Sequence, residues 1–113
     1  MSTIEYNIFV KGGNIYEIIT TDTFDNWFEN LKSIKVRSRI ADRIDRIKEG
    51  NLGDVKTVGN GISELRFHFE SGYRIYFIKQ NDTIIILLCG GNKKTQSKDI
   101  KKAEEIAREV RNG

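Results

Sequence analysis

The chain has 113 residues, which predicts one domain spanning residues 1–113, and its net charge of +3 excludes a uniformly basic nucleic-acid wrapper. One cysteine and one histidine are too few for a zinc site of the usual kind, so we expect no metal and no cofactor. No apolar run is long enough to span a bilayer and no signal-peptide pattern opens the chain, so we expect a cytoplasmic protein with no membrane partner.

The first half of the chain predicts one strand followed by two helices. Residues 1–14 are either part of an opening hairpin or an N-terminal extension, and the first firm strand is the apolar segment Ile15 to Thr20. Capping residues at 21–23 and aromatic residues at helical spacing predict a helix up to residue 31. A break near Ser33 leads into a second helix, which ends at Gly50.

The second helix carries a basic stripe along one edge. Arg39, Arg43 and Arg46 are spaced at i, i+4 and i+7, which places them on neighbouring turns. One interpretation is a solvated face with an Asp42–Arg46 ion pair, and the other is a docking surface for nucleic acid or an acidic partner. The sequence leaves both open.

The second half predicts three antiparallel strands and a final helix. Residues 51–61 are a glycine-rich connector, and Lys56 within it could reach over the sheet. The strands are expected at 64–69, 73–77 and 83–88, the last of them apolar throughout and therefore interior. The fold class is thus α+β, in the order β-α-α-β-β-β-α, with a mainly antiparallel sheet, helices on one side and a partly open polar face.

Alternation gathers polar side chains on that face. Arg66 and His68 share one face of their strand, and Arg74 and Tyr76 share the same face of the next. A three-residue loop ending in Gly72 would pair His68 with Arg74 and Arg66 with Tyr76. The result is a patch of two arginines, the only histidine and a tyrosine.

This patch has the chemistry of an RNA-cleaving site. Arg66 and Arg74 are planar forks that suit a phosphate, and arginines on either side would favour a neutral His68 able to accept a proton. Lys93 and Lys94 follow a glycine pair and precede a helix, where backbone amides also favour anions. The alternative is that His68 is a bystander and that Arg66 only pairs with a neighbouring glutamate.

Seven motifs in conserved order carry a resemblance to a known family. From Ile15 to Val110 the chain resembles the RelE/ParE toxin superfamily of type II toxin–antitoxin systems, and most of all its HigB-like addiction module killer proteins. The motifs are Phe24-Asp25-Asn26-Trp27, Arg43-Ile44-Asp45-Arg46-Ile47, Gly50 to Lys56, Glu64-Leu65-Arg66, Gly72-Tyr73-Arg74-Ile75-Tyr76, Leu87 to Lys93 and Gln96 to Ile100.

The resemblance implies a compact fold like that of microbial ribonucleases and a growth-arresting activity. Many relatives are ribosome-dependent endoribonucleases that cut mRNA during translation without a metal. It also implies a cognate antitoxin, usually a helix-turn-helix protein that represses the shared operon, so that operator DNA is reached only through the antitoxin.

The resemblance also assigns roles to residues. Arg74, in the Gly-Tyr-Arg motif, matches the family's catalytic arginine, Lys93 and Lys94 occupy the place of its basic residue after the last strand, and Arg66 lies where relatives carry basic residues. Together with His68 these form the predicted catalytic set. The residues expected to bind RNA around them are Lys56, Arg39, Arg43, Arg46, Tyr76 and Gln96.

One departure from the family matters for the chemistry. RelE proper has a catalytic tyrosine early in the last helix, and the corresponding position here is Ile100. His68, Lys56 or the lysine pair are the candidate replacements. The departure also leaves open a ParE-like inhibitor of DNA gyrase, or a non-catalytic remnant that binds only nucleic acid or its antitoxin.

Overall fold

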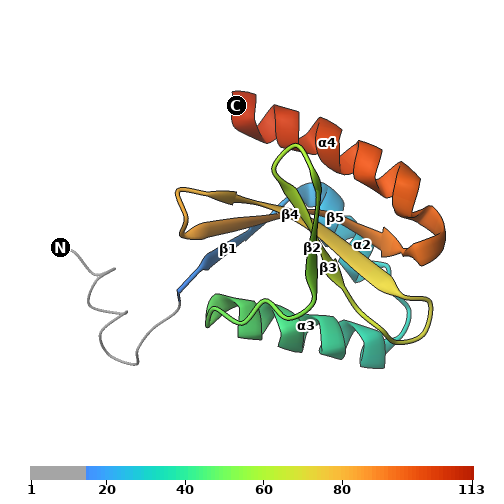
Figure 1. Cartoon of the computed structure of the whole chain (residues 1–113). Helices are drawn as coiled ribbons and strands as arrows, with labels where there is room; N and C mark the ends of the chain where they lie inside the picture. The colour runs from blue at the N-terminus through green and yellow to red at the C-terminus, as the bar shows by residue number, and fades with distance from the viewer. Residues whose placement is uncertain (1–14) are drawn as a thin grey trace.

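The computed structural model describes residues 15–113, and the expectation for residues 1–14 lies outside this part of the chain. Its strands form a mixed sheet, and its helices pack against this sheet (Figure 1). They are β1 (Glu17–Thr20), α2 (Asp22–Glu29), α3 (Ile34–Lys48), β2 (Val55–Gly59), β3 (Ile62–Arg66), β4 (Tyr73–Gln80), β5 (Ile84–Asn92), the 3-10 turn η1 (Lys93–Thr95) and α4 (Gln96–Asn112).

The five strands form one sheet in the order β1-β5-β4-β3-β2. β1 runs parallel to β5, and the other neighbouring pairs are antiparallel. β5 therefore lies inside the sheet, as its continuous apolar sequence predicted. The α+β class and the mainly antiparallel sheet are confirmed.

Helices cover both faces of this sheet, so the expectation of helices on one side was wrong. α2 and α3 contribute Phe24 and Ile40 to one buried cluster, whereas α4 contributes Ala103 and Ala107 to a second. Figure 1 shows α3 and α4 on opposite sides of the strands. α4 packs on the second face because the β4 and β5 side chains on this side are also apolar and are removed from water by the helix. The small side chains of Ala103 and Ala107 let the helix approach closely.

The glycine-rich connector contains a strand that the sequence analysis missed. β2 pairs with β3 through a two-residue loop, Asn60 and Gly61, whose φ angles of 55° and 76° suit a tight hairpin turn. Leu52 and Val55 pack against the cluster beneath α2 and α3. Four strands, not three, therefore follow the helix pair.

Short polar side chains set the starts of the first two helices. The Thr21 hydroxyl accepts a hydrogen bond from the Phe24 amide at 3.0 Å, and Ser33 accepts one from Val36 at 3.2 Å. These caps confirm the break between the two predicted helices. Across residues 15–113, no helix combines the length and the apolar character needed to cross a bilayer.

The β3–β4 hairpin has a different register from the predicted one. Arg66 lies opposite Arg74, and Glu64 lies opposite Tyr76, a shift of two residues that keeps every side chain on its expected face. The loop is longer than three residues because β3 ends at Arg66. His68 is consequently outside the strand and not opposite Arg74.

Gly90 in β5 lies directly under the Trp27 ring, where a Cβ would collide with the indole. We predict that Gly90→Ala lowers the free energy of unfolding by about 1–3 kcal/mol because the ring must shift within a packed core. Urea denaturation measures the change. In a Trp27→Ala background the same substitution should cost markedly less, and an equal cost there would contradict the steric explanation.

Candidate functional site

A cavity of about 570 Å³ lies between the β3–β4 loop and η1. Figure 1 shows the β3–β4 loop and the segment that leads into α4 near each other at the right-hand edge. The five predicted catalytic residues all line this cavity, although the register predicted for them was wrong. Its lining residues are Arg66, Phe67, His68, Glu70, Ser71, Gly72, Arg74, Lys93 and Lys94.

Strand pairing brings the lysines to the loop. Tyr73 at the start of β4 lies opposite Asn92 at the end of β5, so Lys93, the residue after Asn92, lies beside the hairpin loop that precedes Tyr73. The Lys93 amide donates to the Ser71 carbonyl at 3.4 Å. A Cβ on Gly72 would lie 3.5 Å from the Lys93 side chain, which shows how closely the two segments approach.

Arg74 is a buried cation that keeps its hydrogen-bonding capacity. Its exposed fraction is only 6%, yet within residues 15–113 its guanidinium makes no hydrogen bond, and its Nε atom is fully buried without a partner. The nearest carboxylate oxygen, Oε2 of Glu64, is 3.9 Å from Nε. A buried guanidinium in this state is prepared to bind an anion that enters the cavity.

Glu64 is a buried carboxylate at the centre of a polar network under α4. Its Oε2 atom accepts hydrogen bonds from the Tyr76 hydroxyl at 3.1 Å and from the Gln96 amide at 2.7 Å. Burial also raises the pKa of Tyr76, with Glu64 adding to the effect. Tyr76 is fully buried, so its prediction as an RNA-binding residue is corrected to an internal role. Gln96 is half-buried and donates to Glu64, and its contact with RNA stays a prediction.

Some backbone amides at the lysine turn are already occupied. The Asn92 side chain accepts hydrogen bonds from the amides of Lys94, at 2.9 Å, and Thr95, at 3.2 Å. No side chain caps the start of α4, so the expectation that amides there help to hold an anion stays a prediction. Lys93 and Lys94 are themselves exposed and can supply charge to the cavity.

His68 pairs with a carboxylate that the sequence analysis did not single out. Its Nε2 atom lies 2.5 Å from Oδ2 of Asp54, and Nε of Arg66 lies 4.0 Å from the same oxygen. The hydrogen bond from His68, and the nearby Arg66 charge, hold the pKa of Asp54 below its usual value. His68 thus sits against a carboxylate and not between two arginines as expected. The signal that would have found Asp54 is the missed β2 strand, because Asp54 directly precedes it.

Arg43 is directed into the fold. Its guanidinium donates to three backbone carbonyls: Leu52 at 3.1 Å, Asp54 at 2.8 Å and Arg66 at 2.6 Å. It also lies 4.6 Å from the centre of the Phe67 ring. Burial lowers the pKa of Arg43 from its ordinary value, and the Asp54 charge opposes this. Each of its three nitrogens contacts a carbonyl, so Arg43 has a structural role, and its predicted contact with RNA stays a prediction.

The other two arginines of the stripe remain exposed. Arg39 and Arg46 line a second cavity of about 500 Å³, between α3 and the β3–β4 loop, and Arg39 lies 4.9 Å from the centre of the Phe69 ring. Arg66 and His68 line both cavities, so the two are neighbours. Among the ion pairs of residues 15–113 there is no Asp42–Arg46 pair. Lys56 is exposed on β2 and lines neither cavity.

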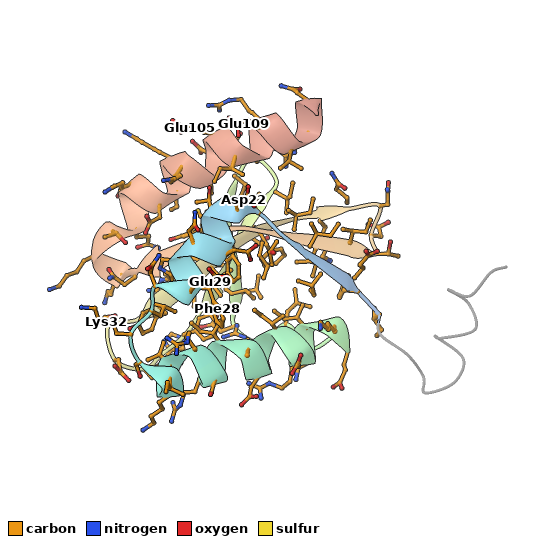
Figure 2. The ribbon with its side chains drawn as sticks, turned by 180° about the vertical axis from the view of Figure 1, so that it is seen from behind. Asp22, Phe28, Glu29, Lys32, Glu105 and Glu109 are labelled. Atoms are coloured by element: carbon orange, nitrogen blue, oxygen red, sulfur yellow. The ribbon has the colours of Figure 1, made fainter. Side chains whose placement is uncertain are left out.

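The opposite side of the molecule carries charges of both signs. Figure 2 shows Asp22 and Glu29 on α2, Lys32 after this helix, and Glu105 and Glu109 on α4, seen from behind. Lysines line the surface around Glu105. The two cavities also combine arginine and lysine with carboxylates.

Cys89 is buried, and burial raises the pKa of its thiol to about 12, so it is not prepared to act as a nucleophile. In the part of the chain that the structure describes, His, Cys, Asp and Glu side chains form no cluster of three or more suited to a metal ion.

Comparison with known proteins assigns the chain to a family. Residues 26–111 match the family described as phage derived protein Gp49-like (DUF891). The chain belongs to this family, a toxin-like family related to addiction modules. It is also similar to a protein of Haemophilus influenzae, described as uncharacterized, with 49% identity over 94 residues that cover 83% of this chain and 95% of the relative.

The three carbonyl contacts of Arg43 predict a large effect on stability. Arg43→Ala should lower the free energy of unfolding by about 2–3 kcal/mol, because three backbone carbonyls, two of them partly buried, lose a charged donor. Arg46→Ala is the matched control, since this exposed side chain makes no hydrogen bond or ion pair within residues 15–113, and it should change stability by less than about 0.5 kcal/mol. Equal effects in urea denaturation would contradict this interpretation.

For the Glu64–Arg74 pair we predict that substitutions of the two residues change the free energy of unfolding in a strongly non-additive way. Glu64→Gln should lower the free energy of unfolding by about 3 kcal/mol, because it leaves the buried Arg74 charge without compensation. Adding Arg74→Met to this variant should restore much of the loss, since both charges are then gone. Denaturation of the single and double variants tests the coupling, and additive losses would show that the two charges do not depend on each other.

Proposed function

We propose that this protein is the toxin of a type II toxin–antitoxin system and that it cleaves mRNA on the ribosome as a HigB-like member of the RelE/ParE superfamily. The observation that carries the proposal is the buried, unbonded guanidinium of Arg74 in a cavity lined by other cations. A phosphodiester is an anion that this cavity would bind. Membership of a toxin-like family supports the same conclusion.

Each step of a cleavage by transesterification can be assigned to a residue of the cavity. The ribose 2′-hydroxyl attacks the adjacent phosphorus while His68 accepts its proton, and the bond from phosphorus to the 5′ oxygen breaks. Arg74 and Arg66 stabilise the charge that grows on the phosphate oxygens. Lys93 or Lys94 supplies a proton to the departing 5′ oxygen, which leaves a 2′,3′-cyclic phosphate and a 5′-hydroxyl.

The partners follow from the proposed role. In the cytoplasm the toxin acts on ribosome-bound mRNA, and the exposed Arg39 and Arg46 extend the positive surface next to the cleavage cavity. A cognate antitoxin, of the helix-turn-helix type, would neutralise it and carry the contact with operator DNA. Co-expression of a neighbouring helix-turn-helix gene should then rescue growth.

A second candidate function is favoured by one residue. Ile100 stands where RelE proper has its catalytic tyrosine, and here it packs against the cluster beneath α4. A ParE-like inhibitor of DNA gyrase needs no such tyrosine. Induction of the DNA-damage response with intact transcripts would favour this function over RNA cleavage.

Arg74→Ala tests the proposed function directly. Expression of the wild-type chain should arrest growth and produce new mRNA ends in translated regions, whereas Arg74→Ala should lower the cleavage rate roughly 100-fold or more. Mapping of mRNA 5′ ends measures this, and circular dichroism shows whether the variant is folded. Growth arrest with intact mRNA would overturn the nuclease, and a wild-type chain that causes no arrest would identify a non-toxic remnant.

A further inference from the structure

Asp54 is placed as an orienting carboxylate would be placed in an acid–base site. Its Oδ2 atom is 2.5 Å from Nε2 of His68, a short contact between a carboxylate and an imidazole. His68 is well exposed, with 64% of its side chain accessible, and it lines the cavity that contains Arg74. One ring nitrogen is therefore held by Asp54, which leaves Nδ1 for another partner.

The backbone of Asp54 is anchored more firmly than its position in a connector suggests. Its carbonyl accepts hydrogen bonds from the Arg66 amide at 3.0 Å and from the Arg43 guanidinium at 2.8 Å. Arg43 also binds the carbonyl of Leu52, two residues earlier. A carboxylate held in this way can fix the direction of the imidazole that it binds.

The segment that carries His68 is held as well. The Arg66 carbonyl, two residues before His68, accepts from Arg43 at 2.6 Å, and Ser71 accepts from the Lys93 amide at 3.4 Å. Both ends of the β3–β4 loop are thus tied to other elements. His68 reaches Asp54 from a loop whose two ends are fixed.

We propose that Asp54 is the positioning residue for His68, so that the two side chains act as one acid–base unit in the cleavage cavity. The inference rests on the proposed nuclease function. Asp54 selects the tautomer that carries its proton on Nε2, which leaves Nδ1 as the acceptor of the 2′-hydroxyl proton. The carboxylate then stabilises the imidazolium that forms, and Asp54 itself gains no proton.

The exposed position of His68 makes this arrangement useful. An imidazole on a loop would otherwise sample several rotamers, and catalysis needs its nitrogen within hydrogen-bond distance of the reacting hydroxyl. The Asp54 contact removes this freedom before substrate binds. The Nε atom of Arg66 lies 4.0 Å from the same carboxylate, so in the proposed mechanism Arg66 can bind the phosphate together with Arg74.

Steady-state cleavage of mRNA on purified bacterial ribosomes tests the inference. His68→Ala should lower kcat about 10²–10⁴-fold. Asp54→Asn should lower kcat at least about tenfold with KM unchanged, because the amide no longer provides the negative charge that stabilises the imidazolium. Asp45→Asn is the matched control, since this exposed α3 carboxylate pairs with Lys48 outside both cavities and should leave kcat unchanged.

A double variant separates positioning from mere folding. If Asp54 acts through His68, Asp54→Asn should lower kcat no further in a His68→Ala background. An additional loss there, an unchanged kcat in Asp54→Asn alone, or a rise in KM without a fall in kcat would overturn the inference. The nuclease itself would still stand if wild type cleaves and Arg74→Ala does not. A wild-type chain that cleaves no mRNA would overturn the nuclease and, with it, the role of Asp54.

Discussion

The buried carboxylate of Glu64 is the charge on which the site depends. A guanidinium as buried as that of Arg74 is costly in a protein interior unless an opposite charge lies close by. Glu64 supplies this charge at 3.9 Å without occupying the donors of Arg74, because its Oε2 already accepts from Tyr76 and Gln96. The pair thus leaves the donors of Arg74 available. Three elements, β3, β4 and α4, meet at this one carboxylate, so the fold and the site share the same contact.

Arg43 plays a corresponding role on the other face of the sheet. It connects the carbonyls of Leu52, Asp54 and Arg66, and thereby joins α3 to the connector before β2 and to the end of β3. Gly53 accommodates this arrangement, since its φ angle is +73° and a Cβ there would lie 3.0 Å from the Arg43 Nε. One side chain thus contacts two carbonyls of a loop without regular structure, and Asp54 in this loop lies against His68.

These contacts explain what could and could not be predicted from the sequence. Periodicity correctly assigned the side chains of β3 and β4 to faces, but a register shift of two residues preserves this assignment, so Arg66 opposite Arg74 was not distinguishable from Arg66 opposite Tyr76. The helix stripe could not separate Arg43 from Arg46, because tertiary contacts decide which arginine turns toward carbonyls. The β2 strand was different: Asn60-Gly61 is a strong hairpin signal that the sequence does contain.

Ile100 in α4 bears on both the packing of this helix and the chemistry proposed for the cavity. Ile100 lies against the buried cluster of the second face, so this turn of the helix contributes apolar packing and no acid or base. For RNA cleavage the proton acceptor must then come from elsewhere on the cavity wall, and the β3–β4 loop supplies the only histidine in the chain. A loop residue needs outside support to reach the precision of a helix residue, and the contact between His68 and Asp54 provides it. In the proposed function, the proton acceptor is therefore His68 on a loop and not a residue of α4. Asp54, just before β2, is the carboxylate that orients it.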